Sequence, residues 1–247
     1  MSVATEEATM TSGSVEEYPL EIIRDHLLVR VDGGRALIDT GSPMSIGRGK
    51  PLLLEGRTWQ PGNANESVLD AVHEHLGVDV DWLVGYDILH AHRMLLDWRA
   101  QKAWIGATET KRATATFPIE LVMGVPIIGA SYQGRPVRAV LDSGAALSYA
   151  PRHAVAGARE DEAYRDFYPG AGAFDTATWR VSVTLSGREV ELRAGVLPET
   201  LQMLFALLLG PDGWIIGSDF FRDRAILLDY AAGRVLEVTE GEGPGHS

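Results

Sequence analysis

Cysteine is absent from this sequence of 247 residues, so neither a disulfide nor a thiolate metal site can form. Long apolar runs are absent too, and the stretch from Leu204 to Leu209 is far too short to span a bilayer. Positive charge is scarce: 22 Lys and Arg stand against 34 Asp and Glu, and the net charge of -12 argues against nucleic-acid and anionic-membrane partners. Residues 1–17 contain no apolar signal segment. These absences together predict a cytoplasmic location.

The polar segments of the chain suggest how it is organised. Residues 1–17 are rich in Ser, Thr and Glu and predict a disordered arm, and residues 240–247 predict a loose tail. Residues 107–116 lack an apolar period and predict a linker. The chain is therefore expected to hold two units, at 18–106 and 117–239.

An internal repeat relates these two units. The segment Ala36-Leu-Ile-Asp-Thr-Gly matches Ala139-Val-Leu-Asp-Ser-Gly, and Trp82-Leu-Val-Gly matches Trp214-Ile-Ile-Gly. In both units the Trp-containing block is followed, at the same spacing, by an apolar strand that ends in Asp. Two blocks that recur in the same order indicate a duplication.

Most of the remaining pattern is typical of β-structure. Alternating apolar residues flank three turn sequences, Asp32-Gly33-Gly34, Gln133-Gly134 and Ser186-Gly187, and predict three hairpins. Two helices are expected. Ser67–Leu76 opens with the capping spacing Ser67 to Asp70, and Glu199–Leu209 lies between Pro198 and Gly210.

The two Asp-containing loops carry the candidate chemistry. Asp39 and Asp142 each follow three apolar strand residues, where burial of a lone carboxylate is costly. The hydroxyl residues Thr40 and Ser143 come next and can hydrogen-bond within a tight turn. A glycine then follows in each loop, Gly41 and Gly144, and lets backbone N–H groups approach the carboxylate.

Two such carboxylates brought together could not both ionise, so the pair would hold one proton over a wide pH range. The ionised member could take a proton from a water, and the protonated member could donate to a scissile carbonyl. The pattern therefore predicts hydrolysis of peptide bonds without a covalent intermediate.

With these loops and the two Trp-containing blocks, residues 20–239 resemble the pepsin and retropepsin superfamily of aspartic peptidases. The resemblance implies an all-β fold of two lobes related by a pseudo-two-fold axis, with Asp39 and Asp142 as the catalytic dyad. It also implies hydrogen bonds between the lobes from Thr40 and Ser143, and a bond from Ser42 to Asp39. Ala145 stands at the position of Ser42 in the second unit and cannot make such a bond.

The first unit is shorter than the resemblance implies, and no flap tyrosine lies between Ile46 and Leu83. The glycine-rich stretch from Tyr168 to Phe174 precedes a hairpin and could supply a flap from the second unit. Tyr149 and Tyr168 are accordingly the candidate substrate-binding residues. Two other readings remain open: a peptide-binding pseudo-protease with too open a cleft, and an assembly module that uses the apolar helix Leu201–Leu209.

The other polar and aromatic residues have structural explanations. Asp87 and Asp219 are expected to cap short helices, and the aspartates that end the two apolar strands, Asp97 and Asp229, are expected to start turns. The bulky aromatic residues of the repeat are expected in the core: Trp82, Trp98, Trp214 and Tyr230. The histidine pairs His73/His75 and His90/His92 have a spacing that points their rings to different helix faces. No metal and no cofactor is expected, and the expected partner of this monomer is a peptide or unfolded protein.

Overall fold

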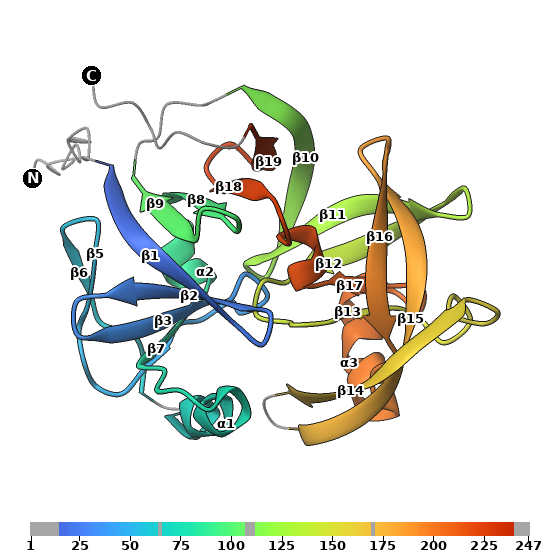
Figure 1. Ribbon diagram of the computed structural model, residues 1–247, viewed down its shortest axis with the longest axis horizontal. Helices are drawn as coiled ribbons and strands as arrows, with labels where there is room; N and C mark the ends of the chain where they lie inside the picture. The colour runs from blue at the N-terminus through green and yellow to red at the C-terminus, as the bar shows by residue number, and fades with distance from the viewer. Residues whose placement is uncertain (1–14, 64–65, 107–111, 169–170, 240–247) are drawn as a thin grey trace, which may run out of the picture.

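The computed structural model describes residues 15–63, 66–106, 112–168 and 171–239, and these form a mainly β structure (Figure 1). The strands of the N-terminal half are β1 (Glu16–Ile23), β2 (His26–Val31), β3 (Gly34–Ile38), β4 (Ile46–Gly47), β5 (Leu52–Leu54), β6 (Arg57–Trp59), β7 (Trp82–Val84), β8 (Arg93–Asp97) and β9 (Lys102–Ile105). Those of the C-terminal half are β10 (Ala113–Val122), β11 (Val125–Tyr132), β12 (Arg135–Leu141), β13 (Ser148–Tyr149), β14 (Arg159–Tyr168), β15 (Gly172–Leu185), β16 (Arg188–Gly195), β17 (Trp214–Ile216), β18 (Ala225–Asp229) and β19 (Arg234–Val238).

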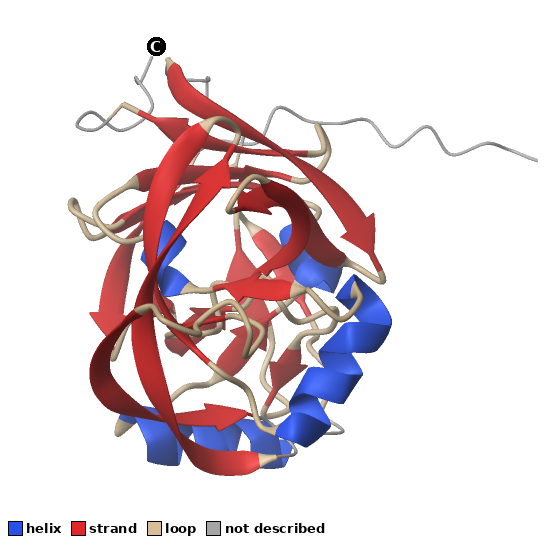
Figure 2. Ribbon diagram, turned by 90° about the vertical axis from the view of Figure 1, so that its right-hand side faces the viewer, coloured by secondary structure: helices blue, strands red, loops and turns tan. Residues whose placement is uncertain are grey.

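Helices are few and lie mostly at the margin of the strands. They are α1 (Glu66–Leu76), α2 (Tyr86–Leu89), α3 (Glu199–Leu209) and the 3-10 turn η1 (Ser218–Phe220). Figure 2 shows the longer helices α1 and α3 outside the sheets. No helix of the described residues is long and apolar enough to cross a membrane. The all-β fold class expected from the sequence is confirmed.

The three predicted hairpins are confirmed, and their turns explain the glycines. Strands β2–β3, β11–β12 and β15–β16 pair antiparallel around the three predicted turn sequences. Gly33, Gly134 and Gly187 each have a positive φ, between 76° and 91°, which costs glycine less than any other residue. Both predicted helices are present as α1 and α3.

Some predicted boundaries differ from the structure. Helix α1 begins at Glu66, so Ser67 lies inside the helix and does not cap it. Strand β1 begins at Glu16, inside the segment expected to be an arm. Strand β10 begins at Ala113 because residues 113–116 pair with β19, so this part of the expected linker belongs to a sheet. The rest of the expected arm, linker and tail lies outside the described residues, apart from Val15, Arg112 and the ends of these strands.

The two halves use the same pairing scheme around their Asp-containing loops. Strand β3 runs parallel to β7 with Ile38 opposite Val84, and β12 runs parallel to β17 with Leu141 opposite Ile216. Strand β4 pairs antiparallel with β7, and β13 pairs antiparallel with β17. The repeated sequence blocks therefore occupy equivalent places in two copies of one local arrangement.

One sheet joins the halves, in the strand order β1-β9-β8-β18-β19-β10, and every neighbouring pair in it is antiparallel. At its centre β8 of one half pairs with β18 of the other, with Leu95 opposite Leu227. Arg93 lies opposite Asp229 and Asp97 opposite Ala225. In the repeat Arg93 corresponds to Ala225 and Asp97 to Asp229, so interchange of the two segments turns one of these pairs into the other. The pairing of β8 with β18 is therefore symmetric about Leu95 and Leu227.

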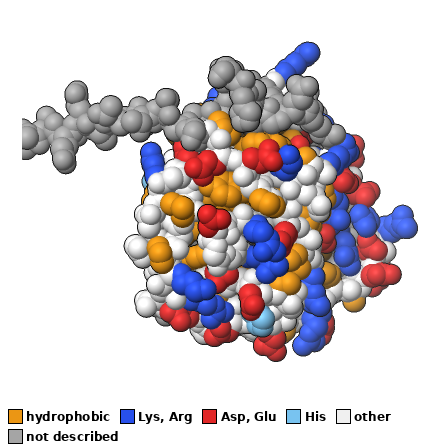
Figure 3. Space-filling view, turned by 60° about the vertical axis from the view of Figure 1, so that its left-hand side comes forward, with side chains coloured by type: hydrophobic (Ala, Val, Ile, Leu, Met, Phe, Trp, Pro, Cys, Tyr) orange, Lys and Arg blue, Asp and Glu red, His pale blue; other side chains and the backbone are white. Residues whose placement is uncertain are grey.

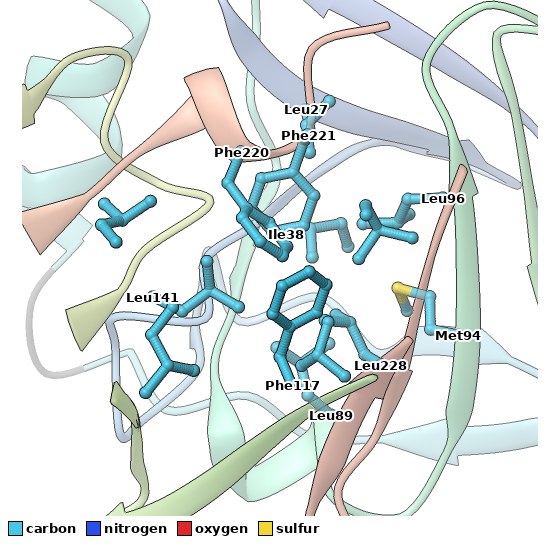
Figure 4. Packing of buried hydrophobic residues seen from close by; sticks show 14 of the residues in the cluster. Leu27, Ile38, Leu89, Met94, Leu96, Phe117, Leu141, Phe220, Phe221 and Leu228 are labelled. Carbon is cyan, nitrogen blue, oxygen red and sulfur yellow. The ribbon is translucent and has the colours of Figure 1, made fainter. Parts of the chain in front are cut away.

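The largest core cluster contains residues from both halves. Figure 4 shows Phe117, Phe220 and Phe221 packed between leucine and isoleucine side chains of β2, β3, β8, β12 and β18. Trp82 and Trp214 are both 1% exposed, and Tyr230 is also buried. Trp98 is partly buried and packs against the same cluster, so the repeated aromatic residues are core residues, as predicted. On the face of Figure 3, charged side chains of both signs are interspersed with apolar ones.

The hairpins between the repeated blocks differ in size and place. The short hairpin β5–β6 lies against β1, where the Glu55 N–H donates to Tyr18 Oη at 3.1 Å. The much longer hairpin β14–β15 of the second half extends toward α1 of the first (Figure 1), and the rings of Phe167 and His75 lie 6.2 Å apart. Only the second hairpin therefore spans the space between the halves.

Candidate active site

Asp39 and Asp142 follow the last residues of β3 and β12, and the neighbouring strands fix both positions. The N–H of Asp39 donates to the Val84 carbonyl at 3.0 Å, and the N–H of Asp142 donates to the Ile216 carbonyl at 2.9 Å. A glycine follows each of these partners because the loop passes directly over it. A Cβ at Gly85 would lie 2.7 Å from the Ser42 carbonyl oxygen, and one at Gly217 would lie 2.6 Å from that of Ala145.

Thr40 and Ser143 tie the two loops together, as the resemblance implied. The Thr40 hydroxyl donates to the Leu141 carbonyl at 2.7 Å and accepts the N–H of Ser143 at 2.9 Å. The Ser143 hydroxyl donates to the Ile38 carbonyl at 2.6 Å and accepts the N–H of Thr40 at 3.1 Å. Both side chains are fully buried. These four reciprocal bonds form a clamp that fixes the position of one Asp loop relative to the other.

The clamp brings the carboxyl groups of Asp39 and Asp142 into a direct hydrogen bond with each other. Gly41 and Gly144 make this approach possible, because each loop's glycine lies against the other loop's carboxyl group. A Cβ at Gly144 would lie 2.5 Å from Asp39 Cγ, and one at Gly41 would lie 2.6 Å from Asp142 Oδ1. Any larger residue at either glycine would push the two carboxyl groups apart.

Both carboxyl groups hold their protons more tightly than an ordinary aspartate. Burial raises the pKa of Asp39 well above its usual range, and the neighbouring Asp142 raises it further. Burial also raises the pKa of Asp142, but the N–H of Gly144, 2.9 Å from Oδ1, and the bond from Asp39 lower it. Since both pKa values are raised and the two groups are hydrogen-bonded, the pair retains one proton that the two carboxyl groups share.

Ser42 does not make the bond that the resemblance implied. Its hydroxyl donates to the Met44 carbonyl at 2.8 Å, and it is the backbone N–H of Ser42 that bonds the Asp39 carboxyl. The backbone N–H of Ala145 bonds Asp142 in the same way. The two carboxyl groups thus receive equivalent backbone donors, and the side-chain difference between Ser42 and Ala145 does not reach them.

The predicted helix caps at Asp87 and Asp219 are wrong, because both carboxylates bond residues distant in sequence. Asp87 accepts the N–H and hydroxyl of Ser45, at 2.8 and 2.5 Å. Asp219 accepts the Ser148 hydroxyl at 3.3 Å and the N–H of Arg193 at 2.9 Å. The two serine oxygens accept the N–H groups of Gly85 and Gly217, at 2.9 and 3.1 Å. Sequence reasoning missed these serines, although each lies six residues after its catalytic candidate.

A small cavity of about 70 Å³ lies against the aspartate pair. The hairpin β14–β15 forms its cover with Asp166, Phe167, Tyr168 and Phe174, and the rest of its lining comes from Asp39, Asp142, Gly144, Ala145, Tyr149, Leu197 and Ile215. The structure thus places Tyr149 and Tyr168, the candidate substrate-binding residues, beside the pair. Phe167, Phe174 and Asp166 belong to the same lining and were not expected.

The two tyrosines are held differently. Tyr149 is buried and donates from its hydroxyl to Asp166, and burial raises its pKa, as does the charge of Asp166. Tyr168 is partly exposed, and burial together with the charges of Asp142 and Asp39 raises its pKa to about 12. Both hydroxyls are therefore neutral hydrogen-bond donors at physiological pH.

The remaining polar candidates lie away from the pair. Asp97 and Asp229 start turns, as predicted, and accept the N–H groups of Ala100 and Ala232 at 2.9 and 3.2 Å. Among the described residues no group of His, Cys, Asp and Glu has an arrangement that could hold a metal ion.

Comparison with known proteins does not identify a family for this chain. No family model matches the chain, and no curated protein matches it. The solution structure of the protease of simian foamy virus (mac) is similar to part of it, at 18% identity and a TM-score of 0.28. That match covers 37% of this chain and 86% of the viral one. Because so low a TM-score does not establish a shared fold, any function has to be argued from the site itself.

Proposed function

We propose that this protein is an aspartic endopeptidase in which Asp39 and Asp142 activate a water between them. The observation that carries the proposal is the direct hydrogen bond between two carboxyl groups whose pKa values are both raised. A pair that shares one proton supplies a general base and a general acid at the same place. The reciprocal clamp and the self-complementary central sheet support two duplicated lobes related by a pseudo-two-fold axis.

The shared proton gives the two aspartates complementary roles. The ionised member takes a proton from the water as its oxygen attacks the peptide carbonyl carbon, and the protonated member donates its proton to the carbonyl oxygen. The resulting tetrahedral diol collapses when the aspartate that took the water's proton passes it to the amide nitrogen and the C–N bond breaks, while one hydroxyl of the diol returns a proton to the other aspartate. The products are a carboxylic acid and an amine, and the pair again holds one proton.

Substrate entry requires the cover to open. The cavity beside the pair, about 70 Å³, is large enough for a few waters but not for a peptide. Tyr168 and Phe167 lie at the end of the long hairpin, which joins the second half at its far end through β16 and β11. An outward motion of this hairpin would expose the pair, and its return would exclude water around the bound peptide.

Cleavage of a denatured protein tests the proposal. Wild-type protein is expected to cleave it and to be inhibited by pepstatin, whereas Asp39→Asn and Asp142→Asn should lose at least about 10³-fold in rate. Asn keeps the shape of the loop but can neither accept nor donate the required proton. Circular dichroism should show both variants folded. Wild-type activity in either variant would exclude the pair as the catalyst.

A measurement of peptide binding, made beside the cleavage assay, separates the two alternatives. A pseudo-protease would bind an extended peptide without cleaving it, and an assembly module would do neither. Helix α3 does expose Met203, Leu204 and Leu207, at 72%, 54% and 88%, while Leu201 and Leu209 face the core. A self-associating protein without peptide binding would favour the assembly module.

A further inference from the structure

Asp166 is a buried carboxylate in the cover of the site, and no step of the proposed hydrolysis uses it. It is 4% exposed and lines the same cavity as Asp39 and Asp142. The alternation of strand β14 puts Tyr164, Asp166 and Tyr168 on one face, the face turned toward the pair. Asp166 thus lies between two tyrosines on the face of the hairpin β14–β15 that is turned toward the pair.

The hydrogen bonds of Asp166 orient it without neutralising it. Tyr149 donates to Oδ2, and the N–H of Phe167 donates to Oδ1 at 2.7 Å. A carboxylate has about four acceptor positions, so two remain free. Within the described part of the chain Asp166 has no ion pair with Arg, Lys or His. Burial of a carboxylate without a cation is costly, and a cation bound beside Asp166 would offset that cost.

The surroundings of Asp166 leave the cavity negatively charged. None of the described residues that line it is a Lys, Arg or His, while three are aspartates. His26 and His75 lie near enough for Asp166 to influence them, but burial lowers the pKa of both, so they are neutral at physiological pH. A cation that enters would be attracted by Asp166 and would offset the charge of the pair.

We propose that Asp166 is a specificity-determining residue that binds the basic side chain of a substrate residue flanking the scissile bond. This inference rests on the proposed function and names its substrate class: peptides with Lys or Arg beside the cleaved bond. The aliphatic stem of such a side chain would lie against Phe174 and Leu197, and its charged group would reach the free positions of Asp166.

Two peptides that differ only by Lys or norleucine at the flanking position test this. The ratio of their kcat/KM values is expected to favour Lys by about tenfold or more in wild type and to fall to about one in Asp166→Asn. Asp175→Asn is the matched control, because Asp175 lies on the same hairpin but is exposed and paired with Arg165. It should keep the wild-type ratio. A ratio near one in wild type, or one unchanged in Asp166→Asn, would overturn the proposal.

Binding of two analogues of these peptides, in which the scissile bond is reduced and cannot be cleaved, tests this inference apart from the peptidase activity. If the analogue with Lys binds better, Asp166→Asn abolishes that preference, and the cleavable peptides are not cut, the peptidase is refuted and the specificity role is supported. If the cleavable peptides are cut with no preference for Lys, the peptidase is supported and the specificity role is refuted. If Asp166→Asn does not fold, Tyr149→Phe removes only the orienting hydroxyl, and the Lys preference should then fall at least about threefold. An unchanged preference in Tyr149→Phe would count against the proposal.

Discussion

At the scale of single residues, the aspartate pair is positioned by groups that carry no charge. The hydroxyls of Thr40 and Ser143 join the loops, and the missing side chains of Gly41 and Gly144 let the carboxyl groups meet. Burial of both carboxyl groups and their closeness keep one proton on the pair, which acid–base hydrolysis requires.

The raised pKa of Asp39 predicts a pH-dependent effect on stability. As the pH rises above about 4, the unfolded chain loses this proton first, so the wild-type protein loses stability until the pH passes the folded-state pKa. Asn cannot ionise. Asp39→Asn should therefore gain stability relative to wild type by about 1 kcal/mol or more between pH 4 and neutral pH. Urea unfolding across this range measures the difference, and a difference independent of pH would refute the raised pKa.

At the scale of elements, each Asp loop is tied to the end of the Trp-containing strand, β7 or β17, and to the turn that follows it. Ser45 links the first loop to Gly85 and Asp87, and Ser148 links the second to Gly217 and Asp219. These ties hold β7 and β17 under the loops. Their recurrence in both halves indicates that the loop and the strand beneath it form one structural unit.

Replacement of either serine by alanine should destabilise the protein. Ser45→Ala and Ser148→Ala each leave a buried glycine N–H without its acceptor, which costs about 1–3 kcal/mol, although Asp87 and Asp219 each keep a backbone N–H donor. Ser42→Ala is the control, because its hydroxyl only donates to the carbonyl of the exposed Met44, and a change within about 0.5 kcal/mol is expected. Chemical denaturation measures all three. Equal losses for Ser42 and Ser45 would show that the tie does not stabilise the loop.

The elements also show what sequence reasoning can reach. Hairpin turns and helices α1 and α3 were predictable because glycine conformations and apolar periods act within a few residues. The positions of the two Asp loops followed from the repeat. The partners of Asp87 and Ser42 were mispredicted because the choice between a local and a distant hydrogen bond depends on tertiary packing. Asp166 carried no motif, and only the folded hairpin brings it to the pair.

At the scale of the whole molecule, the central sheet makes the two halves depend on each other. Strands β8 and β18 meet along their length, and Leu95 and Leu227 lie opposite each other at its middle, exposed by 6% and 2%. The core phenylalanines lie between both halves (Figure 4). The site therefore exists only when the two halves are joined, since each supplies one aspartate and half of the clamp.

Truncation of a central leucine should reveal this dependence. Leu227→Ala leaves a cavity at the junction and should cost about 2–5 kcal/mol, with the site lost in the same unfolding transition. Leu207→Ala removes a side chain that is 88% exposed and should cost less than about 0.5 kcal/mol. Unfolding followed by both tryptophan fluorescence and residual activity is the measurement. Loss of activity well before loss of fluorescence would show that the halves separate without unfolding.

The pH dependence of kcat/KM on one peptide tests the central claim, that Asp39 and Asp142 share a catalytic proton, most directly. The account predicts a bell-shaped profile for wild type, because both the fully protonated and the fully ionised pair are inactive. Its alkaline limb should lie well above about pH 4, the ordinary pKa of an aspartate, since the pKa of Asp39 is raised. Asp39→Asn and Asp142→Asn should be inactive at every pH. A profile without an alkaline limb, or a bell that persists in either variant, would contradict the claim.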